Sequence, residues 1–164
     1  MKKSILVLGV AIMSLALMQD ASAQTAAQAV SLSVSKVYRL AITGVPTISL
    51  AINAGVAGTN ALTSVSDASS TYAITQNNST ATKITANLDA TMPKGKLNIL
   101  VASTKGTSAG TVDISAATSA SAVNVVTAIG LGAESGKSIT YTFSANASEG
   151  TFSASKTVTL TVID

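Results

Sequence analysis

The residues that could carry chemistry in this chain are few, because two side-chain types used by most enzyme sites are missing. The 164 residues include no histidine and no cysteine. The chain therefore lacks the base of Ser-His-Asp and Cys-His systems, and also the side chains that most often ligate zinc, copper or haem iron. We expect no catalytic residues, no bound metal and no cofactor.

Serine and lysine occur twice at the spacing Ser-x-x-Lys, which serine acyl-transfer enzymes use with both residues on one helix face. The two pairs are Ser33 with Lys36 and Ser153 with Lys156. In a strand, an offset of three residues places the two side chains on opposite faces. The companion motifs are also missing, so we interpret both pairs as chance matches in a serine-rich chain.

Acidic side chains offer two further kinds of chemistry. Outside the first 23 residues they are Asp67, Asp89, Asp113, Glu134, Glu149 and Asp164. Glycoside hydrolysis needs two carboxylates at one cleft, whereas these are sparse and mostly fall in predicted loops, so we expect them to serve solubility. Calcium held by Asp67, Asp113 or Glu149 with loop carbonyls stays open as an alternative, although no EF-hand or nonapeptide repeat is present.

The first 23 residues have the features of a secretory signal peptide in the expected order. Met1-Lys2-Lys3 is basic, residues 5–18 are apolar, and Ala21-Ser22-Ala23 is a small-residue cleavage site. We expect cleavage before Gln24, transit through the periplasm, and a final location outside the cell or at its surface. The apolar run is too short for stable membrane insertion.

The charge of the remaining chain argues against nucleic acid as a partner. Residues 24–164 carry eight basic and six acidic side chains, a net charge of +2. The basic residues are scattered, and the chain has three Tyr, two Phe and no Trp. A nucleic-acid surface needs clustered Lys and Arg, often with aromatic side chains between them.

Alternation of apolar and polar residues runs through the rest of the sequence and predicts an all-β fold. We expect a single-domain antiparallel β-sandwich over residues 37–164, Ig-like or jelly-roll-like, with about nine to ten short strands. Residues 70–76 and 82–88 are predicted to form a hairpin, and residues 130–137 a turn or loop. Further strands are predicted at 47–52, 96–102, 111–115, 123–129, 139–145 and 157–162.

One alternating stretch, residues 29–43, is more than twice as long as a common strand. Its even positions are apolar except for Lys36, and its odd positions are largely serine and other small or polar residues. Such a strand either bends to serve two sheets of its own domain, or sends its first half to a neighbouring molecule.

Residues 71–103, then a Gly/Ser loop, then SITYTFSANAS and the terminal TVTLTVID, resemble small secreted bacterial β-sandwich proteins. More loosely, the layout resembles surface-fibre subunits, namely chaperone–usher pilins and TasA/camelysin-type matrix fibres. The resemblance implies a fibre in which an N-terminal extension completes the sheet of the next subunit. Chaperone–usher pilins often carry a disulfide, which this chain cannot form.

These observations predict a non-catalytic structural subunit of an extracellular filament or matrix, with copies of itself as partner. Residues 24–36 form the N-terminal extension, in which Val30, Leu32 and Val34 are the side chains expected to enter a neighbouring subunit. The alternatives are a long first strand within one monomer, and a monomeric secreted adhesin or binding module that recognises a glycan or a surface. We find no positive indication of an enzyme.

Overall fold

The computed structural model describes residues 24–164, and the predicted signal peptide at 1–23 lies outside the described residues. The chain divides into two units, Met1–Val34 and Ser35–Asp164. In the first unit, the described residues 24–34 form neither strand nor helix. The second unit contains every strand of the described chain.

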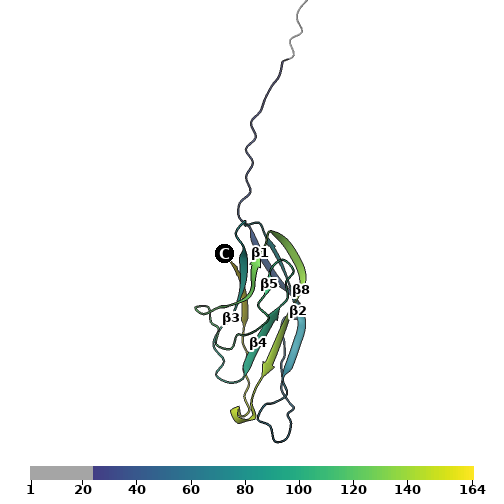
Figure 1. The fold of residues 1–164 in the computed structure, drawn as a ribbon, viewed down its shortest axis with the longest axis vertical. Coiled ribbons are helices and arrows are strands. Elements are labelled where there is room, and N and C mark those ends of the chain that lie inside the picture. Colours follow the sequence, from purple (N-terminus) through teal and green to yellow (C-terminus); the bar gives the residue numbers. More distant parts are fainter. Residues whose placement is uncertain (1–23) are drawn as a thin grey trace, which may run out of the picture. The chain divides into compact units, whose positions relative to one another are not determined.

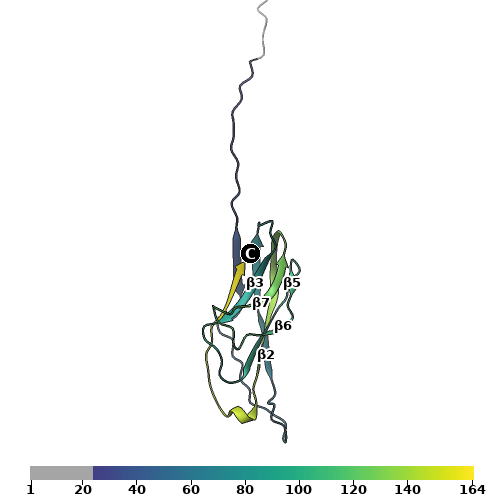
Figure 2. The same cartoon turned by 60° about the vertical axis from the view of Figure 1, so that its left-hand side comes forward.

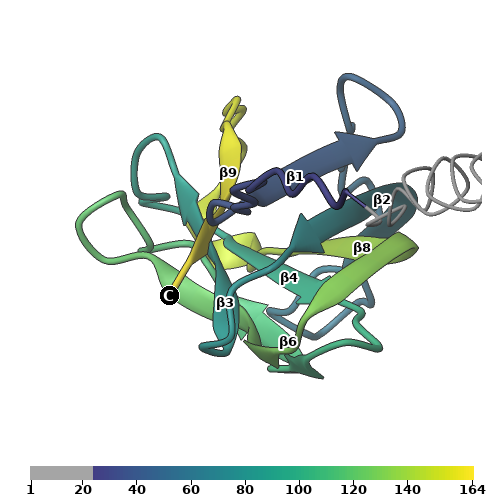
Figure 3. The same ribbon diagram turned by 90° about the horizontal axis from the view of Figure 1, so that it is seen from above.

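The second unit is a sandwich of two antiparallel sheets, which confirms the predicted β-sandwich (Figures 1 and 3). The five-stranded sheet has the order β1-β2-β8-β4-β6 and the four-stranded sheet the order β5-β7-β3-β9. The described residues therefore hold nine strands and one short 3-10 helix, η1. In chain order these are β1 (Tyr38–Thr43), β2 (Val65–Gln76), β3 (Thr82–Leu88), β4 (Lys96–Val101), β5 (Thr107–Ser108), β6 (Thr111–Asp113), β7 (Val123–Ile129), β8 (Gly132–Ser144), η1 (Ala147–Glu149) and β9 (Val158–Ile163).

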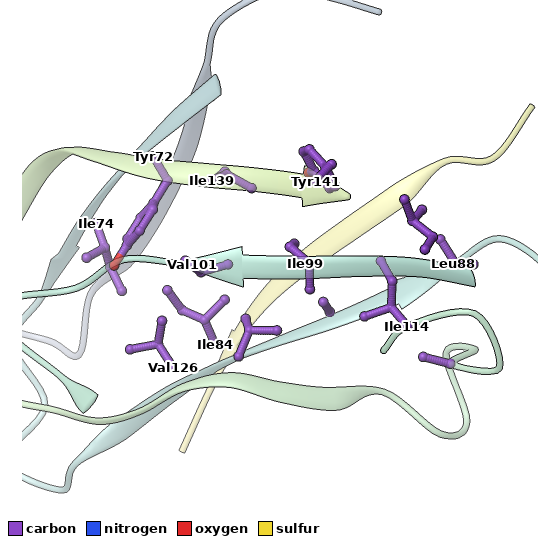
Figure 4. Close-up of a cluster of buried hydrophobic side chains, with 14 of the residues drawn as sticks. Tyr72, Ile74, Ile84, Leu88, Ile99, Val101, Ile114, Val126, Ile139 and Tyr141 are labelled. Atoms are coloured by element: carbon purple, nitrogen blue, oxygen red, sulfur yellow. The ribbon is translucent and has the colours of Figure 1, made fainter. Parts of the chain in front are cut away.

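The core lies between the two sheets and is built from side chains at alternate strand positions (Figure 4). On β8, for example, Ile139 and Tyr141 are buried while Thr140 and Thr142 are more exposed. This is the period-two pattern of a strand with one dry face. The buried apolar residues are Tyr72, Ile74, Ile84, Ala86, Leu88, Leu97, Ile99, Val101, Ile114, Ala117, Val125, Val126, Ile129, Ile139 and Tyr141.

The two ends of the second unit differ. β1 begins and β9 ends at one end, and η1 lies at the opposite end (Figures 1 and 2). β1 and β9 are edge strands of different sheets, and they contact each other. The unit therefore has one side on which both sheets end in an edge strand (Figure 3).

The predicted hairpin of residues 70–76 and 82–88 is wrong. β2 pairs with β1 and β8, whereas β3 pairs with β7 and β9 in the other sheet. Residues 77–81 therefore cross from one sheet to the other. Alternation identified the inward-facing residues of both strands correctly, but it carries no information on which sheet each strand joins.

The predicted loop at residues 130–137 is wrong for most of its length, because β8 begins at Gly132. The ladder with β2 shifts register between the pairs Tyr72↔Lys137 and Ile74↔Glu134, so β8 bulges there. Gly136 lies in this bulge with φ +63°, a backbone conformation that glycine adopts without strain. The glycines that suggested a turn instead allow a long strand to bend.

Two predicted strands are absent or shorter. Residues 47–52 join neither sheet, although the side chains at 48, 50 and 52 are less exposed than those between them. The long first strand expected at 29–43 is limited to β1, which starts at Tyr38. A continuous strand within one monomer is therefore not what the chain forms.

Candidate functional site

The three side chains predicted to enter a neighbour are exposed in the structure. Val30 is 71% exposed, and Leu32 and Val34 are each 88% exposed. All three lie in the first unit, where the described residues form no strand. Large apolar side chains scattered over a surface are common, but three at alternate positions of one segment would share one face if that segment became a strand. We call Val30, Leu32 and Val34 the apolar row.

The chain start of the second unit is held in place by the turn that follows β2. Asn77 Oδ1 accepts a hydrogen bond of 2.6 Å from the N–H of Val37, and Asn77 Nδ2 donates one of 2.9 Å to the carbonyl of Ser35. The backbone N–H of Asn77 donates to the carbonyl of Val37 at 3.4 Å. These bonds fix residues 35–37 before β1 begins.

The last residue of the chain also holds this start. Asp164 accepts hydrogen bonds from Lys36 Nζ at 2.6 Å and from the Tyr38 hydroxyl at 2.8 Å. The bond to Asp164 raises the pKa of Lys36, and the same bond lowers the pKa of Asp164. The groups are exposed, so the pair adds little stability but keeps the first and last residues of the unit together. Lys36 thus lies where the anchored part of the chain begins.

A groove of about 790 Å³ opens on the second unit near η1. One rim is the segment 47–52 and the other is the segment 150–156, which leads into β9. Leu97 of β4 and Phe143 of β8, which are register partners, line the groove together with Met92. Phe152 of the second rim packs edge-to-face on Phe143, with ring centroids 6.0 Å apart.

The backbone of the rim 47–52, and of the rim 150–156 after Gly150, is unpaired within the described chain. Residues 47–52 and 151–156 make no backbone hydrogen bond to any described residue. An unpaired edge beside an apolar floor is the arrangement that accepts an added strand. The sequence prediction of a strand at 47–52 had the correct period and inward residues, but a partner strand is lacking.

Glu134 on β8 forms the most heavily hydrogen-bonded polar cluster. Its Oε1 accepts from the hydroxyls of Tyr72 at 2.5 Å and Ser103 at 2.8 Å. Its Oε2 accepts from the N–H of Thr104 at 2.8 Å, its hydroxyl at 3.1 Å and the N–H of Lys105 at 3.0 Å. Glu134 is only 8% exposed, so its predicted role in surface solubility is wrong. No pattern in the sequence indicated this cluster.

The electrostatics of this cluster favour a fixed carboxylate. Burial raises the pKa of Glu134, but the hydrogen bonds from Tyr72, Thr104, Ser103 and Lys105 outweigh burial and leave it at about 2. Burial, followed by the bond to the carboxylate, raises the pKa of Tyr72. With five donors on its two oxygens, Glu134 is engaged in holding residues 103–105 and has no vacant position facing a substrate.

The other acidic candidates are engaged locally. Asp67 accepts hydrogen bonds from Ser69, and Glu149 accepts them from the backbone of Asn146 and Gly95. Asp113 accepts one from the N–H of Ser115 and forms an ion pair of 3.7 Å with Lys96. Within residues 24–164, no three side chains of a metal-ligating type come together. The alternative of a calcium site built on a cluster of these acids thus finds no support.

Of the Ser-x-x-Lys pairs, Ser153 and Lys156 both line the groove, without a hydrogen bond between them. In the other pair, Lys36 is bonded to Asp164. Over the described range of the chain, no helix has the length and apolar character needed to cross a bilayer.

The second unit thus has three separate features: an anchored chain start, an apolar groove with largely unpaired rims, and a buried carboxylate that holds a loop. No protein-family model matches the chain, and comparisons with curated proteins and with solved structures find no match.

Proposed function

We propose that this chain is a non-catalytic structural subunit of an extracellular bacterial filament or matrix. Residues 24–34 of one copy, the part of the predicted extension 24–36 that precedes the held residues, would add as a strand to the sandwich of the next copy. The observation that carries the proposal is the exposed row Val30, Leu32 and Val34, placed directly before a chain start that hydrogen bonds hold.

The energetics of such a joint are favourable. Moving three exposed aliphatic side chains out of water contributes on the order of 5–8 kcal/mol before ordering costs, at about 25 cal/mol per Å² of apolar surface. Main-chain hydrogen bonds along the added strand contribute affinity that does not depend on side-chain identity. Because residues 35–37 are held, the strand would leave each subunit from a fixed point.

The inventory of reactive groups supports a role without catalysis. The chain lacks histidine and cysteine, and its buried carboxylate is fully engaged in hydrogen bonds. The predicted export of the mature chain agrees with an extracellular role, and its lack of disulfides leaves the subunit dependent on packing.

A monomeric secreted adhesin is the second candidate. The feature that favours it is Phe152, which is 37% exposed beside hydroxyl-bearing residues of the groove rims. An aromatic face beside hydroxyls is suited to the apolar face of a sugar ring. A glycan array probed with purified protein at low concentration would detect such binding.

The assembly proposal is tested with purified protein that begins at Gln24, compared with a chain lacking residues 24–34. We expect filaments in negative stain for the first and monomers of unchanged thermal midpoint for the second. The matched substitutions are Val30→Ser, Leu32→Ser and Val34→Ser together, expected to abolish assembly, and Ser31→Ala with Ser33→Ala, expected to retain it. An intact chain that stays monomeric at high concentration, or a shortened chain that still forms filaments, would overturn the proposal.

A further inference from the structure

We infer that the groove between segments 47–52 and 150–156 is the acceptor for the N-terminal strand of a second copy of this chain. The inference rests on the proposed function and adds the place at which the strand binds. The occupant is the row Val30, Leu32 and Val34, lying along the rim 47–52 and covering Leu97 and Phe143.

The spacing of the row matches that of the rim. Successive side chains on one face of a strand are about 6.6–7 Å apart. The row has apolar side chains at every second position from 30 to 34, and the rim turns Ile48, Leu50 and Ile52 inward at the same interval. Two extended segments laid side by side would therefore keep their apolar side chains in step.

Charge and hydrogen bonding are also compatible. Residues 24–35 contain no charged side chain, and Lys156 is the one charged residue among the described residues that line the groove. The added strand would therefore bury almost no charge and would avoid the penalty of removing an unpaired ion from water. Its backbone would instead meet N–H and C=O groups of a rim that has no partner within the described chain.

The groove is out of reach for the row of the same molecule. The held residues 35–37 lie at the end of the unit where β1 begins, whereas the groove starts at Thr47, beyond the far end of β1. A strand of six residues spans roughly 17–20 Å, while Val34 and Leu32 can extend only about 4 and 11 Å from Ser35. The three side chains cannot enter their own groove together, which leaves the groove of another copy.

The positions of exit and groove predict the form of the assembly. β1, which follows the held residues 35–37, begins at the end of the second unit opposite η1 (Figures 1 and 2). The groove is lined in part by Ala147 of η1 and by Gly150, which follows η1. A contact between two different surfaces of the same molecule leaves one of each surface available, so subunits add head to tail. Such a contact builds an open filament when the rotation between copies does not close a ring.

Disulfide mapping tests the acceptor directly, because the native chain has no cysteine. Two single-cysteine forms are mixed, one with cysteine in the row and one with cysteine in the rim, and are assembled and then oxidised. The nine pairs formed by positions 30, 32 and 34 with positions 48, 50 and 52 allow for any register, since a disulfide needs Cβ atoms about 3.5–4.5 Å apart. Leu32→Cys mixed with Ser121→Cys, on an exposed loop, is the control.

We expect a crosslinked dimer of the two forms for one to three of the nine pairs, and at least tenfold less for the control. Filaments that give no row-to-rim crosslink would overturn the acceptor while leaving the proposed function intact. Absence of filaments would overturn the proposed function and this inference with it. Equal crosslinking in the control, or a crosslink within one diluted chain carrying both cysteines, would also overturn the inference.

Discussion

The hydroxyl of Tyr72 on β2 donates a hydrogen bond of 2.5 Å to the carboxylate of Glu134 on β8, and both side chains are buried. The same carboxylate accepts bonds from residues 103–105, which connect β4 of one sheet to β5 of the other. Glu134 therefore ties a strand pair of the first sheet to a segment that crosses toward the second.

Replacing Glu134 by Gln should lower the free energy of unfolding at pH 7 by about 1–3 kcal/mol, because an amide group would face donors that need an acceptor. The effect should depend on pH. The pKa of Glu134 is lowered from 4.5 to about 2 in the folded state, so its stabilisation is complete above about 4.5 and is lost as the pH falls toward 2. Urea unfolding of both proteins at pH 7 and at several values from 5 to 2 measures the difference.

Two further variants test whether the effect comes from the hydrogen bonds of Glu134 and not from the loss of any carboxylate. Tyr72→Phe retains the ring and removes one donor, so it should cost about 1 kcal/mol and raise the pKa of Glu134. Asp67→Asn changes a partly exposed carboxylate whose hydrogen bonds within residues 24–164 come from Ser69, and should stay within about 0.5 kcal/mol. If the stability gap between the native protein and Glu134→Gln stayed constant from pH 5 to pH 2, the assigned role of the carboxylate would be wrong.

The bounds of two strands were predicted correctly, since 82–88 and 123–129 match β3 and β7 at both ends. Alternation of apolar residues accounts for 82–88, where it leaves one arrangement with a dry face. In β7 the adjacent Val125 and Val126 are both buried, and its ladder with β3 shifts register. The fold class also followed from alternation. Local periodicity does not show which strands pair when they are distant in the sequence. The pairing of β2 with β8, and the crossing of the chain to the other sheet after Gln76, therefore could not be predicted.

Of the two parts of the candidate site, the N-terminal row could be predicted from the sequence and the groove could not. Val30, Leu32 and Val34 were identifiable from their spacing and from Lys36, which interrupts the row. The groove was not, because it depends on three-dimensional proximity of the segments 47–52 and 150–156, more than 90 residues apart in the chain. Glu134 gave no signal either, since a single acid between glycines and alanine is typical of a turn.

Gly106 lies where no side chain fits. A Cβ there would stand 2.7 Å from the carbonyl oxygen of Thr127 and 2.8 Å from methyl or methylene carbons of Ile129 and Val126. We expect Gly106→Ala to lower the free energy of unfolding by about 1–3 kcal/mol, because well-packed surroundings must move to admit the added carbon. Chemical denaturation of the purified variant measures this loss.

Gly130, between β7 and β8, provides the matched control. A Cβ at Gly130 would meet only the carbonyl oxygen of Lys105, at an ordinary 3.8 Å. Gly130→Ala should therefore lie within about 0.5 kcal/mol of the native protein. Equal losses for the two variants would show that steric contact at Gly106 is not the cause.

Asn77 is expected to control how rigidly the N-terminal segment leaves the sandwich. Asn77→Ala removes the acceptor for the Val37 N–H and the donor to the Ser35 carbonyl. The core should stay folded, with a loss of about 0.5–1.5 kcal/mol for exposed hydrogen bonds. Hydrogen exchange should speed up at the Val37 amide and remain unchanged in the buried strand β3.

Asn78→Ala is the control, because it changes the same turn without removing the hydrogen bonds that Asn77 makes to Ser35 and Val37. The Asn78 side chain donates to the Tyr38 hydroxyl at 2.7 Å and makes no bond to residues 35–37, so the Val37 amide should keep its native exchange rate. On the proposed function, filaments of Asn77→Ala should bend more in negative stain than those of Asn78→Ala, because the joint loses its fixed origin. Unchanged protection of the Val37 amide in Asn77→Ala would mean that other contacts, such as Lys36 with Asp164, hold the chain start.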